Sequence, residues 1–176
     1  MLGRHGSRMG KSLLAVQSHS AEETQRHGAA LGRVLRGGDV VALTGDLGAG
    51  KTTFVQGVAM GMGWRGRVTS PTFTLINEYA LNGELRILHV DGYRLEGGAE
   101  AAALGLEELL GSEETITIIE WPERMRDLLP FDMLEISFVE GDGGEESRRL
   151  TVRGGGPRSA GRLAEWMAAM ENQGEA

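Results

Sequence analysis

The sequence predicts an α/β protein with the P-loop NTPase fold, in which helices flank a mixed, mostly parallel central sheet that also carries β-hairpins. A short apolar run at 39–45, DVVALTG, leads into the glycine-rich stretch 44–54, TGDLGAGKTTF, and then into a helix-like segment. Two further apolar runs, at 84–91 and 115–120, each end in an acidic residue. Together these observations indicate strands that bring a phosphate-binding loop and two carboxylates to one edge of a sheet.

The N-terminal half begins with residues 12–18, SLLAVQS, which we predict to form an edge strand. Ser20 and Glu23 have the spacing of a helix capping box, and the helix that they start should end at Gly37–Gly38. The apolar run 39–45 then forms a short strand, and KTTFVQGVAMGMG (51–63) forms the helix after the glycine-rich loop.

The middle of the chain contains a hairpin signal. TFTLINEYA (72–80) and ELRILHVD (84–91) are strand-like and are separated by Leu81-Asn82-Gly83, and Asn-Gly between such runs is typical of a tight β-turn. Residues 99–110, AEAAALGLEELL, should be helical, and TITIIE (115–120) should be a buried strand.

The C-terminal part contains a second hairpin. The segment 121–130 has two prolines and should be irregular or a short helix. DMLEISFVE (132–140) and SRRLTVR (147–153) alternate apolar and polar residues around the glycine-rich loop GDGGEE. RSAGRLAEWMAAM (158–170) is predicted to be a last amphipathic helix.

These elements indicate one domain at 12–153, preceded by a flexible extension at 1–11 and followed by a C-terminal helix and tail at 154–176.

Composition excludes several classes of protein. The chain has 176 residues and no cysteine, so it forms neither disulfides nor thiolate metal sites. A net charge of −7 disfavours strong direct binding to nucleic acid. No apolar run has the length of a membrane span, and the basic N-terminus lacks the apolar stretch of a signal peptide. We therefore expect a cytoplasmic protein that is not inserted in a membrane.

Gly45, Gly50, Lys51 and Thr52 match the pattern G-x-x-x-x-G-K-[ST] between a predicted strand and a predicted helix. Glycines allow the backbone N–H groups to face phosphate oxygens, and the start of the helix adds about half a positive charge. Lysine supplies a point charge for the β- and γ-phosphates, and the threonine hydroxyl is a ligand for Mg²⁺. The residues that we expect to bind ATP here are Asp46, Leu47, Gly48, Ala49, Gly50, Lys51, Thr52 and Thr53.

The two strand-end acids are Asp91 and Glu120. If both strands run parallel to 39–45, both carboxylates emerge at the carboxyl edge of the sheet, where one can bind Mg²⁺ and the other can orient or deprotonate water. Their spacing does not decide which acid has which role. Trp121 follows Glu120 directly, and the residue type alone favours packing in the core over contact with a nucleotide.

Several kinds of NTPase are disfavoured. The chain has no N-K-x-D or D-x-x-G motif of a GTPase, no transporter-ATPase signature, and no basic track of a helicase. A small-molecule kinase and a nucleotide-gated binding module without useful turnover remain as alternatives to an ATPase.

Five segments occur in one order: GDLGAGKTTFVQG, SPTFTLINEY, LHVDGYRLE, LGLEELL and IIEWPER. In this combination the chain resembles the TsaE family of bacterial tRNA threonylcarbamoyladenosine biosynthesis ATPases, from about Ser18 to about Val152. The family usually has FDLYR in the middle segment, where this chain has Val90 and Gly92 but keeps the acid, the tyrosine and the arginine.

The resemblance implies a slow, partner-dependent ATPase that acts with the proteins TsaB and TsaD. That complex transfers a threonylcarbamoyl group to N6 of adenosine 37 in tRNAs that read codons starting with A. The ATPase does not carry out this transfer itself, it meets tRNA only through the complex, and its hydrolysis of ATP is thought to reset the complex.

For the site, the resemblance implies that Thr52 and Glu120 contact Mg²⁺ and that Asp91 supports the metal and the water. It also implies that Ser70–Thr74 is a switch-like segment near the γ-phosphate. Trp121 is then placed near the nucleotide, and Arg148 is expected to touch ATP.

Overall fold

The structure, a computed structural model, describes residues 13–173. The predicted extension at 1–11 lies outside these residues. The strands are β1 (Leu13–Ser18), β2 (Val40–Thr44), β3 (Ile76–Ala80), β4 (Arg86–Asp91), β5 (Thr115–Glu120), β6 (Leu134–Glu140) and β7 (Arg148–Gly154). The helices are α1 (Ala21–Val34), α2 (Lys51–Gly61), α3 (Gly98–Ala103), α4 (Leu106–Leu109), the 3₁₀ helix η1 (Pro122–Leu128) and α5 (Pro157–Glu171).

All seven strands form one sheet in the order β1-β7-β6-β2-β5-β4-β3. The four strands β6, β2, β5 and β4 are mutually parallel, whereas β7 and β3 pair antiparallel with their neighbours. The α/β fold with a mixed, mostly parallel sheet is therefore confirmed, and so are both predicted hairpins. In the β4–β5 register Asp91 lies opposite Glu120, so the two acids do reach the same edge.

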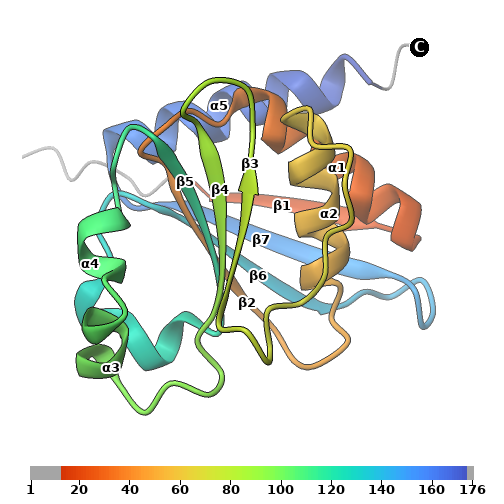
Figure 1. The fold of residues 1–176 in the computed structure, drawn as a ribbon. Helices are drawn as coiled ribbons and strands as arrows, with labels where there is room; N and C mark the ends of the chain where they lie inside the picture. The colour runs from red at the N-terminus through yellow and green to blue at the C-terminus, as the bar shows by residue number, and fades with distance from the viewer. Residues whose placement is uncertain (1–12, 174–176) are drawn as a thin grey trace, which may run out of the picture.

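Helices cover both faces of the sheet (Figure 1). On one face α1, α2 and α5 pack over a core that includes Leu31, Phe54 and Trp166. On the other face α3, α4 and η1 cover a smaller core around Leu88 and Ile119. Strand β5 is buried along its whole length because it lies between these two layers, which explains its continuous apolar sequence.

Helices α1 and α2 pack so closely that side chains cannot fit between them. A Cβ atom at Gly57 would lie 2.0 Å from the Gln25 carbonyl oxygen, and one at Gly32 would lie 2.2 Å from the Val58 carbonyl oxygen. Because both helices begin at the carboxyl edge of the sheet, this contact fixes α1 beside the phosphate loop. The N-cap predicted at Ser20 is confirmed, since its hydroxyl accepts from the Glu23 N–H at 3.1 Å. The other half of the predicted capping box differs, because the Glu23 carboxylate accepts from the N–H of His19, at 2.7 Å.

Three predicted boundaries are wrong. Strand β3 begins at Ile76, because residues 72–75 form a turn in which the Leu75 N–H donates to the Pro71 carbonyl at 2.8 Å. The helix predicted at 99–110 is divided into α3 and α4 by Gly105, which has a φ of 76°. Helix α1 ends at Val34 rather than at Gly37–Gly38, since Leu35 already has an extended backbone.

Hydrogen bonds to two carboxylates, one of them the buried Asp39, hold helix α5 against the rest of the molecule. Asp39, at the start of β2, accepts from Arg158 at 2.8 Å and from Arg162 at 2.6 Å. Asp132 accepts from the first N–H groups of α5, those of Arg158 and Ser159. The helix contributes to the same core as β2, although the boundary at 154 remains a prediction. Within 13–173, no helix combines the length and the apolar character that crossing a membrane requires.

Candidate functional site

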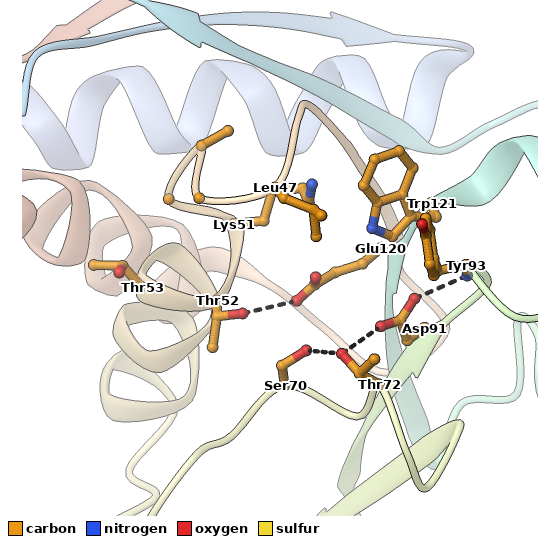
Figure 2. Close-up of a pocket in the computed structure, with 13 residues that line it drawn as sticks. Leu47, Lys51, Thr52, Thr53, Ser70, Thr72, Asp91, Tyr93, Glu120 and Trp121 are labelled. Atoms are coloured by element: carbon orange, nitrogen blue, oxygen red, sulfur yellow. Dashed lines mark hydrogen bonds between the residues drawn. The ribbon is translucent and has the colours of Figure 1, made fainter. Parts of the chain in front are cut away.

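A cleft with a volume of about 360 Å³ lies at the carboxyl edge of the sheet, between the loop after β2 and the ends of β4 and β5 (Figure 2). Its lining comes from distant parts of the chain. The lining residues are Leu47, Gly48, Ala49, Gly50, Lys51, Thr52, Thr53, Ser70, Thr72, Asp91, Tyr93, Glu120 and Trp121. A cleft of this size is within the range of small-molecule sites.

The loop between β2 and α2 has the backbone of a phosphate cradle. Gly50 has a φ of 99°, and α2 begins at the next residue, Lys51. Glycine adopts this left-handed conformation without steric cost. As at the start of any helix, the first N–H groups of α2 have no partners inside the helix. The positive end of an 11-residue helix therefore points into the cleft.

Lys51 lies almost fully buried beneath this loop. Its Nζ donates to the carbonyl oxygens of Gly45 and Asp46, the second at 3.1 Å. Burial lowers the pKa of Lys51 below its ordinary value of 10.5, and the carboxylates of Glu120 and Asp91 oppose this shift. The ammonium group is thus poorly solvated and held by weak acceptors, so a phosphate oxygen is a favourable replacement for them.

Trp121 lies in the cleft and belongs to neither core cluster, so the preference for core packing drawn from its residue type is wrong. Its ring centroid is 4.2 Å from Lys51 Nζ and 5.1 Å from the ring of Tyr93. The backbone has a positive φ of 53° here. A Cβ atom at Gly92 would lie 2.3 Å from the Trp121 carbonyl oxygen. Glycine at this position therefore allows the segment after β4 to lie close to the segment after β5.

Glu120 is bonded to residues of two other elements. Its Oε1 accepts from the Thr52 hydroxyl of α2 at 3.3 Å, and it lies 2.8 Å from His89 Nε2 of β4. The Thr52 hydroxyl donates a hydrogen bond to Glu120, so the lone pairs of the Thr52 oxygen remain free for a cation. Figure 2 shows the Glu120 side chain reaching from the end of β5 towards Thr52.

Asp91 organises the segment before β3. Its Oδ2 accepts from the Thr72 hydroxyl at 3.1 Å, and the Ser70 hydroxyl is 2.8 Å from that of Thr72 (Figure 2). Its Oδ1 accepts from the Tyr93 N–H at 2.9 Å. Its own backbone N–H donates to the carbonyl of Leu75, which has a strained φ of 65°. Asp91 therefore links the proposed switch segment to the floor of the cleft.

Three residues singled out in the sequence lie elsewhere. Asp46 does not line the cleft and presents its carbonyl to Lys51. Arg148 also lies outside the lining and donates to the carbonyls of Ala49 and Gly48, at 3.0 and 3.2 Å. Thr74 turns away to Asn77, at 2.7 Å. Arg148 therefore supports the loop from behind in this structure, and its contact with ATP remains a prediction.

Two residues of the site were not predicted. His89 is a lone histidine inside an apolar strand, a pattern that indicates a core residue, and only the β4–β5 register reveals that it shares a face with Glu120. Tyr93 lies beside Trp121 in the structure, and its position two residues after the strand-end acid Asp91 was the signal that could have identified it.

The side chains present suit Mg²⁺ bound together with a nucleotide. The donors are hydroxyl and carboxylate oxygens, which Mg²⁺ prefers. In the described part of the chain, no three His, Cys, Asp or Glu side chains gather in a metal-binding arrangement. In nucleotide sites one or two carboxylates suffice, because phosphates and water complete the coordination of Mg²⁺.

The chain is similar to known proteins over most of its length. The model of the family described as "Threonylcarbamoyl adenosine biosynthesis protein TsaE" matches residues 18–150. A curated "tRNA threonylcarbamoyladenosine biosynthesis protein TsaE" from Treponema pallidum is 42% identical over 77% of this chain and 96% of its own length. The protein of the same name from Streptomyces coelicolor is 41% identical over 76% of this chain and 91% of its own length.

Among solved structures, the crystal structure of Bacillus subtilis YdiB is similar to this chain with a TM-score of 0.77 and 31% sequence identity. The similarity covers 90% of this chain and 97% of that one.

Proposed function

This chain belongs to the TsaE family, whose members take part in the biosynthesis of threonylcarbamoyladenosine in tRNA, and from that premise we propose that it is a Mg²⁺-dependent ATPase. It acts with TsaB and TsaD in the cytoplasm and supports the transfer of the threonylcarbamoyl group without performing it. Its contact with tRNA is indirect, through those partners.

One observation carries this proposal: a single cleft joins a phosphate cradle, a buried lysine and two strand-end carboxylates. Lys51, Asp91 and Glu120 are each no more than 5% exposed. Burying three charged side chains is costly unless each has a partner, and a nucleotide phosphate with its cation supplies partners of both signs.

In this proposal the loop N–H groups and Lys51 bind the β- and γ-phosphates, for which Lys51 exchanges its carbonyl acceptors for phosphate oxygens. The hydroxyl oxygen of Thr52 binds the cation, while the hydroxyl group continues to donate its hydrogen bond to Glu120. When bound, Mg²⁺ neutralises charge that develops on the transferred phosphoryl group. Trp121 and Tyr93 form the apolar wall beside the phosphates.

The hydrogen bonds of Asp91 and Glu120 indicate different roles for the two carboxylates. Both oxygens of Asp91 already accept hydrogen bonds, from Thr72 and from the Tyr93 N–H. In Glu120 only Oε1 accepts bonds from the described residues. We therefore assign direct contact with the metal and the attacking water to Glu120, and support of the metal and of the segment at 70–74 to Asp91.

A protein partner is favoured by the rim of the cleft. Leu47 at the tip of the loop is 78% exposed and Phe73 is 84% exposed. Exposed apolar side chains around a polar centre are typical of interaction sites. Phe73 is next to Thr72, whose hydroxyl is hydrogen-bonded to Asp91 in the cleft. The affinity of a partner that covers Phe73 would therefore depend on whether a nucleotide occupies the cleft.

The test is ATP turnover by the purified protein without any acceptor molecule, with Mg²⁺ or with EDTA, and with or without TsaB and TsaD. We expect slow turnover that requires Mg²⁺ and that increases when both partners are present. Turnover that appears only when a small-molecule acceptor is added, with a phosphorylated product, would instead establish the kinase alternative. Nucleotide binding without turnover under all conditions would establish a binding module.

A further inference from the structure

We propose that His89 is a positioning residue that holds the carboxylate of Glu120 in the orientation required for the metal and the water. The proposal rests on the proposed function, because it assigns a role within the same site. His89 lies in the middle of β4, and no pattern in the sequence associates it with the phosphate loop.

The geometry is a chain of three side chains from three elements. His89 Nε2 lies 2.8 Å from Glu120 Oε1, and the same oxygen accepts from the Thr52 hydroxyl at 3.3 Å. His89 and Glu120 lie on neighbouring parallel strands, with Asp91 opposite Glu120 in the register. Since an ionised carboxylate only accepts, the ring donates its Nε2 proton.

His89 makes this contact at a cost. The side chain is fully buried, and its other nitrogen, Nδ1, has no hydrogen-bond partner in the described part of the chain. A histidine that served only to fill the core could be replaced by an apolar residue at lower cost. Within residues 13–173, the only hydrogen bond of the His89 side chain is the one to Glu120.

Two donors on Oε1 fix the rotation of the Glu120 carboxylate. The other oxygen, Oε2, receives no hydrogen bond from residues 13–173 and is the one available to a ligand. Without His89 the carboxylate would be held by Thr52 alone, whose hydroxyl must also serve the cation. His89 would thus be hydrogen-bonded to a carboxylate that binds the metal. The loss of such a supporting contact typically weakens metal binding by about 10-fold to 100-fold.

The experiment measures the affinity for AMP-PNP, a non-hydrolysable ATP analogue, with Mg²⁺ and with EDTA. The ratio of the two affinities reports how strongly metal and nucleotide bind together. The variants are His89→Leu, which removes the donor, and His89→Gln, whose amide nitrogen can reach the same place. Thr117→Val is the matched control, because Thr117 is buried on β5, its hydroxyl has no partner in the described chain, and it lies on the other face of the strand pair.

We expect His89→Leu to lower this ratio by about 10-fold or more, with the affinity in EDTA unchanged. His89→Gln should recover most of the ratio, and Thr117→Val should equal the wild type. In a Glu120→Ala background, His89→Leu should have no further effect. An unchanged ratio in His89→Leu, or an equal loss in the Glu120→Ala background, would overturn the proposal.

A measurement on the wild type avoids any dependence on the folding of the variants. In ¹⁵N-labelled histidine spectra, Nε2 of His89 should carry the proton, and its signal should shift when AMP-PNP and Mg²⁺ are added together. A signal that does not respond would contradict the proposal. If the wild type binds no AMP-PNP at all, the proposed function fails, which is a different result from an unresponsive His89.

Discussion

Lys51 is the side chain on which the phosphate loop depends. The chain has only two lysines against sixteen arginines, and one of the two occupies this position. Its Nζ lies below the loop, in contact with two carbonyls and with the face of Trp121. A compact ammonium group fits this space, whereas the planar guanidinium of arginine is larger and directs its donors differently.

Replacing Lys51 with alanine should therefore lower the affinity for ATP by about 100-fold, because a charged hydrogen bond to phosphate contributes up to about 3 kcal/mol. Lys51→Arg should fail to restore the affinity. Since burial lowers the pKa of Lys51, binding in the wild type should weaken with rising pH earlier than an ordinary lysine would allow. Calorimetric titration with AMP-PNP measures the affinities of both variants and the pH dependence of the wild type. An affinity of Lys51→Ala equal to that of the wild type would refute the role of the loop.

At the scale of elements, α1 is held against α2 by glycines whose positions recur every four residues. Gly28 and Gly32 of α1 face the backbone of α2, and Gly57 and Gly61 of α2 face that of α1. Each would place a Cβ atom within 2.3 Å of a carbonyl oxygen of the other helix. The close contact matters for the site because it sets the position of the first turn of α2.

The substitution Gly57→Ala should lower the free energy of unfolding by about 1–3 kcal/mol, since the added methyl group forces the helices apart. Gly161→Ala is the matched control, because Gly161 lies in α5 with no atom within 4 Å of the added Cβ. It should stabilise the protein by about 0.5–1 kcal/mol through helix propensity. Urea unfolding of both variants tests the contact, and equal effects of the two substitutions would contradict it.

A second prediction at this scale concerns the start of α5. Burial disfavours the ionised form of Asp132, but bonds from the Ser159 hydroxyl and N–H and from the Arg158 N–H outweigh it, so the pKa of Asp132 lies below its ordinary value of 3.8. A carboxyl with a lowered pKa stabilises the folded state above the unfolded pKa, and this contribution is lost as pH falls through the folded pKa.

Asp132→Asn should therefore be less stable than the wild type at neutral pH by up to about 1 kcal/mol, the usual value of a negative charge at the start of a helix. The difference should disappear as the pH falls below the ordinary value of 3.8. Thermal unfolding at a series of pH values provides the measurement. A difference that is the same at all pH values would show that the charge of Asp132 is not involved.

At the scale of the whole molecule, the nucleotide cleft and the apolar rim are connected through the segment 70–74. Thr72 is bonded to Asp91, and the neighbouring Phe73 is exposed at the rim with Arg94 over its ring at 4.6 Å. A γ-phosphate that draws the Thr72 hydroxyl away from Asp91 would move Phe73 as well. Such order and release of a segment by a phosphate is a known kind of switch.

Partner binding should therefore differ between nucleotide states. We expect the wild type to bind the TsaB–TsaD pair about 10-fold more tightly or more weakly with AMP-PNP than with ADP, a coupling of typical size. Thr72→Ala should reduce this difference. Thr74→Ala is the matched control, because its hydroxyl points to Asn77 and away from the cleft. Equal affinities in both nucleotide states of the wild type would exclude the switch.

The fold was predictable wherever the signal is local. The loop motif, the strand-end acids and the N-cap at Ser20 each lie within a few residues, so the sequence reveals them directly. The turn at 72–75 was missed because its β-like residues are held by a bond from a distant strand, Asp91 N–H to the Leu75 carbonyl. His89 was missed for a similar reason, since its role depends on the register between β4 and β5. Contacts of this kind are a property of the assembled sheet.

If this cleft hydrolyses ATP by means of Glu120, the exchange Glu120→Gln should reduce turnover far more than nucleotide binding. The exchange keeps the size of the side chain and removes its charge, in a position bonded to Thr52 and His89. We expect phosphate release from ATP to fall by about 100-fold or more, because the carboxylate acts mainly in the transition state, while the affinity for AMP-PNP measured in EDTA changes only a few-fold. Turnover equal to that of the wild type would exclude this role of Glu120.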